Sequence, residues 1–166
     1  MRSRELDPAQ VALRAYCAGI IDGEGYIGAT RSKPRGTSVS PRFTVRVYVA
    51  MADRQCVETI AKLADAHFYL RSRKQKPHHT PLYVMDITSR QAVGLLYKVM
   101  PYLRAKLQQA KLVCELHDLK QFPERVPNGK NGSLVLSPRH IERCDQLYLQ
   151  MRRRVMTNNG IEARAL

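Results

Sequence analysis

The first 33 residues change from a helical to a strand-like pattern of apolar positions. Apolar side chains recur at helical spacing over residues 8–22, directly after Asp7, whose side chain and following proline are typical of a helix start. Gly23 and Gly25 predict the end of that helix. Residues 26–33 then alternate between apolar and polar side chains, the period of a half-buried strand. We therefore expect a helix that passes almost directly into a strand.

The rest of the chain repeats this change of period. Residues 42–51 alternate strictly, with an apolar face opposite a basic one. The pattern further predicts helices over 53–64, 89–100, 101–122 and 137–155, strands over 67–74 and 82–88, and a loop over 123–133. The order αββαββα indicates an α+β fold, in which two hairpins form one four-stranded antiparallel sheet with helices on one face and added C-terminal helices.

The length of the chain suits one domain. We expect a single domain over residues 1–156, with its core at 8–122 and a C-terminal helix at 137–155. Residues 157–166 are expected to form a tail.

The strong positive charge identifies the class of partner. Lys and Arg exceed Asp and Glu to give a formal net charge of +14 and a pI near 10.1, which favours a polyanion such as nucleic acid. A membrane is not expected, because no apolar run could cross one and no basic amphipathic helix has a bulky apolar face. The polar start and four cysteines without a CxxC pair indicate a soluble intracellular protein with reduced thiols, in a prokaryotic cytoplasm or an organelle matrix.

A stripe of small residues follows the first helix and ends at a carboxylate. Ala15, Gly19 and Gly23 recur every four residues, so two such helices could pack closely along this stripe. Their C-terminal ends would then bring together two copies of Glu24 and the backbone carbonyl of Gly23. Such an all-oxygen site suits a hard divalent cation, Mg²⁺ above all.

Two segments resemble the LAGLIDADG homing endonuclease family. Residues 17–25, CAGIIDGEG, are similar to the motif that gives the family its name, with departures at Cys17 and Gly23. Lys106 ends the segment PYLRAK, which resembles a Pro-aromatic-Leu-x-x-Lys stretch of the family. The resemblance covers about the first 120 residues.

The resemblance implies an intron-encoded homing endonuclease. Such an enzyme hydrolyses both strands of DNA at a long, nearly palindromic site with Mg²⁺ or another divalent ion such as Mn²⁺, and acts on no small-molecule substrate. Since the chain holds one motif, it would work as a homodimer. Glu24 and Lys106 would be catalytic, Glu24 and the Gly23 carbonyl would hold the metal, and the interface or motif structure would involve Ala15, Ala18, Gly19 and Asp22. Asp22 is expected to bond backbone at the helix junction, and Met51 stands where the family often has a polar residue near the active water.

The basic face of the sheet is the expected DNA-reading surface. Side chains at alternate strand positions can reach base edges in the major groove. Our candidates are Thr30, Ser32, Lys33, Arg35, Arg42, Thr44, Arg46, Tyr48, Arg71, Arg73, Lys74, Lys76 and Tyr83. Of these, Lys33, Arg35, Lys74 and Lys76 lie at strand ends and are expected to contact phosphates.

Two alternatives stay open from the sequence. A maturase-like relative would use the same fold to bind intron RNA, and a regulator would bind DNA without cutting it. The acid at Glu24 and the cation at Lys106 favour the enzyme over both.

Overall fold

The structure is a computed structural model that describes residues 7–34, 40–71, 81–128 and 133–158. Five α-helices, a short 3-10 helix and six strands are formed in these ranges. In chain order they are α1 (Pro8–Glu24), β1 (Gly25–Ser32), β2 (Arg42–Met51), α2 (Arg54–Ala64), β3 (Phe68–Arg71), β4 (Leu82–Thr88), α3 (Ser89–Val99), η1 (Met100–Tyr102), α4 (Leu107–Gln121), β5 (Arg125–Pro127), β6 (Leu134–Leu136) and α5 (Pro138–Asn158). The expected order of helices and strands is thus confirmed over the first 99 residues.

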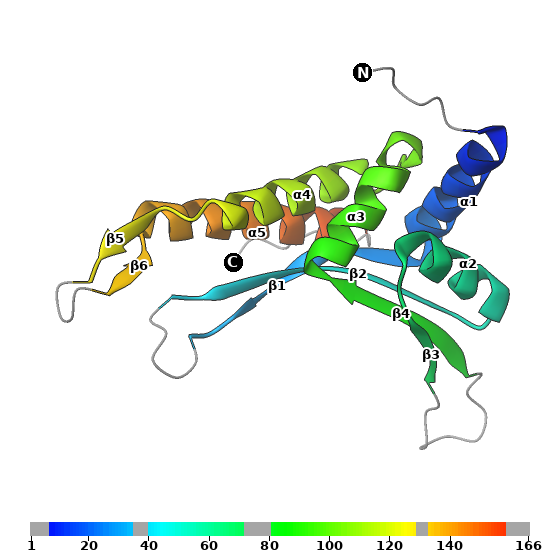
Figure 1. The fold of residues 1–166 in the computed structure, drawn as a ribbon, viewed down its shortest axis with the longest axis horizontal. Coiled ribbons are helices and arrows are strands. Elements are labelled where there is room, and N and C mark those ends of the chain that lie inside the picture. The colour runs from blue at the N-terminus through cyan, green and yellow to red at the C-terminus, as the bar shows by residue number, and fades with distance from the viewer. Residues whose placement is uncertain (1–6, 35–39, 72–80, 129–132, 159–166) are drawn as a thin grey trace.

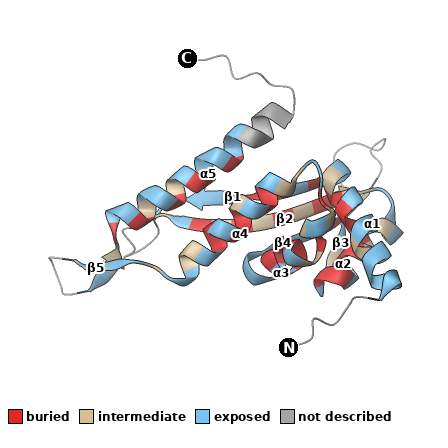
Figure 2. Cartoon of the chain, turned by 90° about the horizontal axis from the view of Figure 1, so that it is seen from above, coloured by how far each residue is buried: buried red, intermediate tan, exposed pale blue. Residues whose placement is uncertain are grey.

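The first four strands form one antiparallel sheet in the order β1-β2-β4-β3. All the helices lie on one side of this curved sheet, and its other face is left open (Figure 1). Seen from above, buried and exposed stretches alternate along the helices, as expected for helices that pack with one side only (Figure 2). The expected mixed fold with helices on one face is confirmed.

The alternation of β2 forms the centre of the core. Val45, Val47 and Val49 are fully buried, and Ile87 and Met85 of β4 lie beside the last two in register. Burying each such side chain contributes roughly 1.5–3 kcal/mol relative to exposure. The same pleat directs every second side chain of β2 to the open face, so the core also fixes which residues that face presents.

The segment after α3 differs from the expected continuous helix over 101–122. Met100–Tyr102 form a 3-10 turn, and α4 begins only at Leu107. Helix α3 also begins differently, because Thr88 is its N-cap and Ser89 has a positive φ of 52°. The break before α4 is held by Asp22, as described below.

The C-terminal part contains a hairpin where we expected a loop. Strands β5 and β6 pair antiparallel, with Val126 opposite Val135. Ser137 then caps α5, since its hydroxyl oxygen accepts a hydrogen bond from the His140 N–H at 3.0 Å. Leu149 of α5 is 51% exposed, although Leu147 and Met151 on either side of it are buried.

The four cysteines form no disulfide, and three of their thiols are buried. Cys17, Cys114 and Cys144 are buried and Cys56 is partly exposed, and all four are free. Burial raises the pKa of Cys17 and of Cys114 to about 11, so both stay protonated at neutral pH. No helix in the described ranges has the length and apolar character needed to span a bilayer.

Candidate functional site

Helix α1 passes into strand β1 without an intervening loop. Glu24 is the last helical residue, Gly25 is the first of the strand, and the Gly25 N–H still donates to the Ile21 carbonyl. A Cβ at Gly25 would lie 2.8 Å from that carbonyl oxygen and 2.9 Å from the Ile21 Cα. Glycine is therefore required for this junction, which places the end of α1 at the edge of the sheet.

The Asp22 carboxylate joins this junction to the segment before α4. One oxygen accepts from the backbone N–H of Arg104 at 2.6 Å and of Ala105 at 3.2 Å, and the other accepts from the N–H of Lys106 at 2.9 Å. Three N–H groups that precede α4 are thereby satisfied by a residue more than 80 positions earlier. This hydrogen bonding has the form we expected for Asp22.

The Lys106 ammonium lies at the C-terminal end of α1. It donates to the carbonyls of Ile21 at 2.9 Å and Asp22 at 2.6 Å, which are acceptors at the negative end of the helix dipole. Partial burial lowers the pKa of Lys106, and the nearby carboxylates of Asp22 and Glu24 oppose this shift. The lysine therefore holds a positive charge close to Glu24 in a partly desolvated position.

The Glu24 side chain is exposed and its carboxylate accepts no hydrogen bond from the described residues. With the adjacent Gly23 carbonyl it offers only oxygen donors, the type that Mg²⁺ prefers. Within the described ranges no three His, Cys, Asp or Glu side chains gather into a metal site. This donor set fits a divalent ion that completes its coordination with water, phosphate oxygens or a second carboxylate.

The small-residue stripe on α1 is exposed. Ala15, Gly19 and Gly23 are exposed, and a Cβ added at either glycine would meet nothing within 4 Å. Ala18 is fully buried within its own chain, so the structure does not place it on this stripe. The exposed stripe is the part of α1 on which a second helix could pack closely.

The register brings most of the expected polar side chains onto the open face. Arg42 of β2 lies opposite Ser32 of β1, Thr44 lies opposite Thr30, and Arg46 lies one pleat further along. Tyr48 continues this row, and Arg71 joins it from β3 across β4. Lys33 follows β1 and is exposed.

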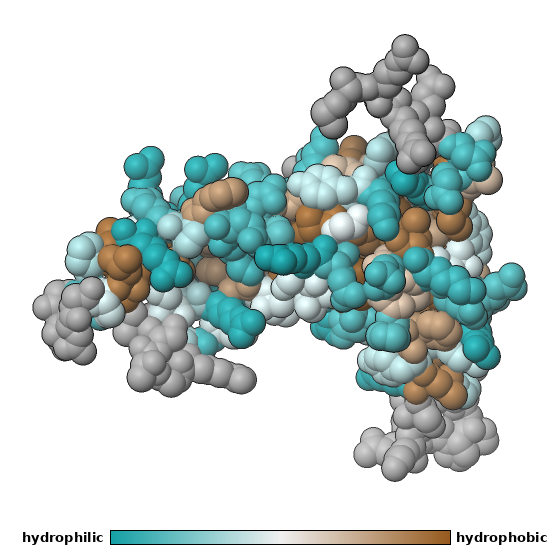
Figure 3. All heavy atoms as spheres, viewed as in Figure 1, coloured by the Kyte–Doolittle hydropathy of each residue, from teal (hydrophilic) through white to brown (hydrophobic). Residues whose placement is uncertain are grey.

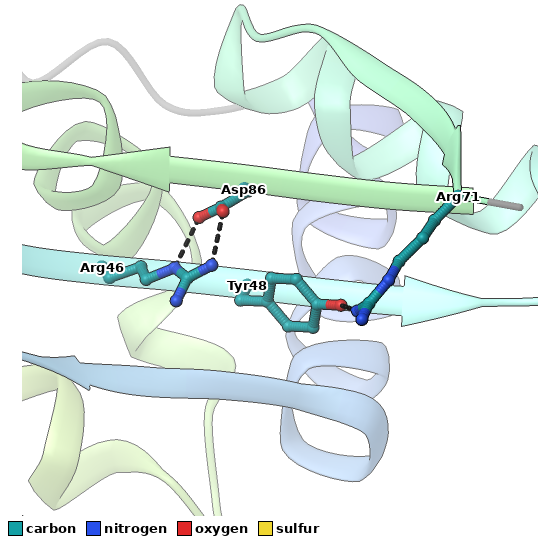
Figure 4. A network of polar contacts seen from close by, with 4 residues as sticks. All are labelled: Arg46, Tyr48, Arg71 and Asp86. Carbon is teal, nitrogen blue, oxygen red and sulfur yellow. Dashed lines mark hydrogen bonds and ion pairs between the residues drawn. The ribbon is translucent and has the colours of Figure 1, made fainter. Parts of the chain in front are cut away.

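A polar network connects β2, β3 and β4 on this face (Figure 4). The Arg46 guanidinium donates from Nε to Asp86 at 2.6 Å and from Nη2 to the other oxygen of Asp86 at 2.5 Å. It also lies over the Tyr48 ring, 5.1 Å from the centroid, and Arg71 donates to the Tyr48 hydroxyl at 3.3 Å. Bonding to Asp86 raises the pKa of Arg46, so this arginine is charged and held in one orientation.

Two expected positions lie on the other face. Tyr83 is opposite Met51 and Leu70, and its ring packs at 6.3 Å from that of Phe68 among the side chains against the core. Our placement of Tyr83 on the open face was wrong, because the pleat assigns odd-numbered residues of β4 to the side of the helices. Met51 also packs against this core.

Four candidates, Arg35, Arg73, Lys74 and Lys76, lie outside the described residues. Sequence reasoning also missed Asp86, an acid on a face that we expected to be basic. Its alternation with Met85 and Ile87 could have placed it there. Its pairing with Arg46 depends on the register between β2 and β4, which the sequence does not state.

The comparisons with known proteins agree on the fold. No protein-family model matches the chain, and no curated protein matches it by sequence. Among solved structures, the homing endonuclease I-CvuI in complex with a DNA target is 19% identical, with a TM-score of 0.66 over 89% of this chain and 85% of that chain. The archaeal intron-encoded homing endonuclease I-Vdi141I, complexed with DNA, is 15% identical, with a TM-score of 0.65 over 87% and 85%.

The homing endonuclease I-TnaI is similar over 95% of this chain and 99% of that chain, at 16% identity and a TM-score of 0.55. The fold of this chain is thus that of the LAGLIDADG homing endonucleases, which confirms the resemblance seen in residues 17–25.

Proposed function

We propose that the chain is a site-specific double-strand DNA endonuclease that acts as a homodimer with a divalent metal. The observation that carries the proposal is the position of Glu24. Its carboxylate is exposed at the end of α1, where the helix joins an open sheet face rich in arginine, threonine and tyrosine. The DNA complexes of I-CvuI and I-Vdi141I, which share the fold, support DNA as the partner.

The open face would read the target in the major groove. A curved antiparallel ribbon fits this groove, and Arg46, Tyr48, Arg71, Thr44 and Thr30 all point to one side. Lys33, at the end of β1, would contact a phosphate.

Glu24 and the Gly23 carbonyl would hold Mg²⁺, or Mn²⁺ in its place. A bound metal supplies an activated water and stabilises the leaving oxygen in phosphodiester hydrolysis. Lys106 would stabilise negative charge that develops near Glu24, because α1 carbonyls hold its ammonium there. Asp22 would act indirectly, by fixing the backbone that carries Lys106.

The homodimer follows from the count of carboxylates. One chain presents one free acid at this position, and the exposed stripe Ala15, Gly19 and Gly23 would let two α1 helices pack side by side. Two copies of Glu24 would then lie close together over the DNA. A two-fold dimer requires a nearly palindromic target.

A binding selection tests the nucleic-acid part of this proposal. The protein is incubated in Ca²⁺ with randomised duplex DNA and, in parallel, with structured RNA. The retained molecules are then sequenced. We expect one long, nearly palindromic site. Retention of structured RNA without any selection of duplex DNA would favour the maturase-like alternative and contradict the proposal.

A further inference from the structure

A second basic surface lies beyond the end of the sheet. A groove of about 720 Å³ opens between the start of β2, the end of α4, hairpin β5–β6 and the first turn of α5. Its wall contains three cations, Arg42, Lys120 and Arg125, together with polar Asn128 and Ser133. No Asp or Glu belongs to the described residues of this wall.

The three cations lie together without compensating acids. Among the described residues, none of them forms an ion pair with a carboxylate, whereas Arg31 and Arg46 each do. Lys120 is partly buried, and both burial and the charge of Arg42 lower its pKa. Like charges held near each other at a partly desolvated position are unfavourable, and a bound anion would remove this cost.

The elements that build the groove are joined by hydrogen bonds. His140 is buried in the first turn of α5, and its Nδ1 accepts from the backbone N–H of Glu124, which precedes β5. The Ser137 N–H donates to the Glu124 carbonyl at 2.9 Å. His140 also belongs to the wall of the groove, so the first turn of α5, the positive end of its dipole, lies beside the cations.

The position of the groove indicates which anion it takes. Arg42 is the first residue of β2 and lies opposite Ser32, the last residue of β1, so the groove begins where the open face ends. Hairpin β5–β6 lies at that end of the molecule (Figure 1), where hydrophilic side chains surround a few hydrophobic ones (Figure 3). Because α4 and α5 lie on the helix side of the sheet, the DNA that can reach the groove is the part that extends past the ends of β1 and β2.

We propose that this groove binds the phosphodiester backbone of the DNA that flanks the bases read by the sheet. Lys120 and Arg125 would each neutralise a phosphate, and they would extend the contacted duplex outward without adding base specificity. The inference rests on the proposed function, because it requires duplex DNA on the open face.

The test compares the wild-type protein with a double variant that carries both Lys120→Gln and Arg125→Gln. Binding is measured on selected duplexes of two lengths. On the long duplex, the slope of log affinity against log salt concentration is expected to be shallower by about 3.6 for the double variant, since two contacts are lost in each of the two protomers and each lost phosphate contact removes roughly 0.9. On a duplex trimmed at both ends, the wild-type and double-variant proteins are expected to bind alike. The preferred base sequence should not change.

Lys111→Gln is the matched control, because Lys111 is an exposed lysine of the same helix that lies outside this groove. Arg125→Gln alone covers the case in which loss of the partly buried Lys120 impairs folding. Equal affinity and slope for wild-type and variant proteins on the long duplex would overturn the groove and leave the endonuclease in place. If inorganic phosphate protects Lys120 from chemical modification while duplex length has no effect on affinity, the groove is a free-phosphate site, and this result would also overturn the proposal. Absence of duplex binding by the wild-type protein would instead reject the proposed function itself.

Discussion

At the scale of single residues, hydrogen bonds across the sheet determine which donors the open face can offer to the proposed DNA partner. Arg46 uses one N–H of Nε and one of Nη2 on Asp86, which leaves three of its five donors for another partner. The guanidinium is thus held in place before DNA arrives, which lowers the entropy lost on binding. In the proposed function Asp86 would act as a positioning residue, and its negative charge would also repel phosphate.

The Asp86→Asn substitution tests this role. It removes the charged acceptor, so we expect looser selection at one symmetric pair of base positions, with equal or tighter binding to unrelated duplexes. Sequencing of selected DNA gives the base preference. Asp145→Asn is the matched control, since Asp145 binds Arg31 through the same two nitrogens but on the side of α5. Unchanged selection by the Asp86 variant, or the same change in both variants, would remove Asp86 from base recognition.

Asp22 supports the site through the backbone. Because its carboxylate accepts from three N–H groups, Asp22→Ala should lower the free energy of unfolding by about 2–3 kcal/mol, the cost of leaving such partners of a charged group unpaired. Urea denaturation measures this difference. A variant as stable as the wild type would show that the segment before α4 is held in another way.

The residue types of the site could be predicted from the sequence, but their partners could not. Glu24, Asp22 and Lys106 are found from the motif and its companion segment. That Lys106 bonds the end of α1 depends on a tertiary contact across more than 80 residues. The face of the sheet on which Tyr83 lies could have been predicted from the two-residue period of β4 alone.

At the scale of elements, long periodic segments were predictable and short ones were not. Helix α1, with its Asp7 cap, and strand β2 have several turns or pleats over which the pattern repeats. Strands β5 and β6 have three residues each, too few to show a period. The expected helix over 101–122 begins only at Leu107, because Asp22 accepts hydrogen bonds from the backbone N–H groups of residues 104–106.

Helix α1 carries the prediction for assembly. Gly19→Leu places a large side chain on the open stripe, so we expect a homodimer to dissociate into monomers. Gly94→Leu on α3 is the control, because Gly94 is also an exposed helical glycine without neighbours within 4 Å of an added Cβ. Sedimentation equilibrium distinguishes the two. An unchanged mass for the Gly19 variant, or equal dissociation of both variants, would contradict packing along this stripe.

At the scale of the whole molecule, the fold separates support from recognition. The helices cover one face of the sheet and leave the other open, while a net charge of +14 favours a polyanion throughout. Glu24 sits where α1 meets this open face, and the proposed dimer would place two such acids over one duplex.

The most direct measurement is therefore cleavage of the selected duplex in Mg²⁺ by the wild-type protein and by Glu24→Gln. We expect double-strand cuts by the wild type, none in the presence of a chelator, and DNA binding without cutting by the variant. Equal cutting by the variant, or cutting that survives removal of the metal, would contradict the proposed function.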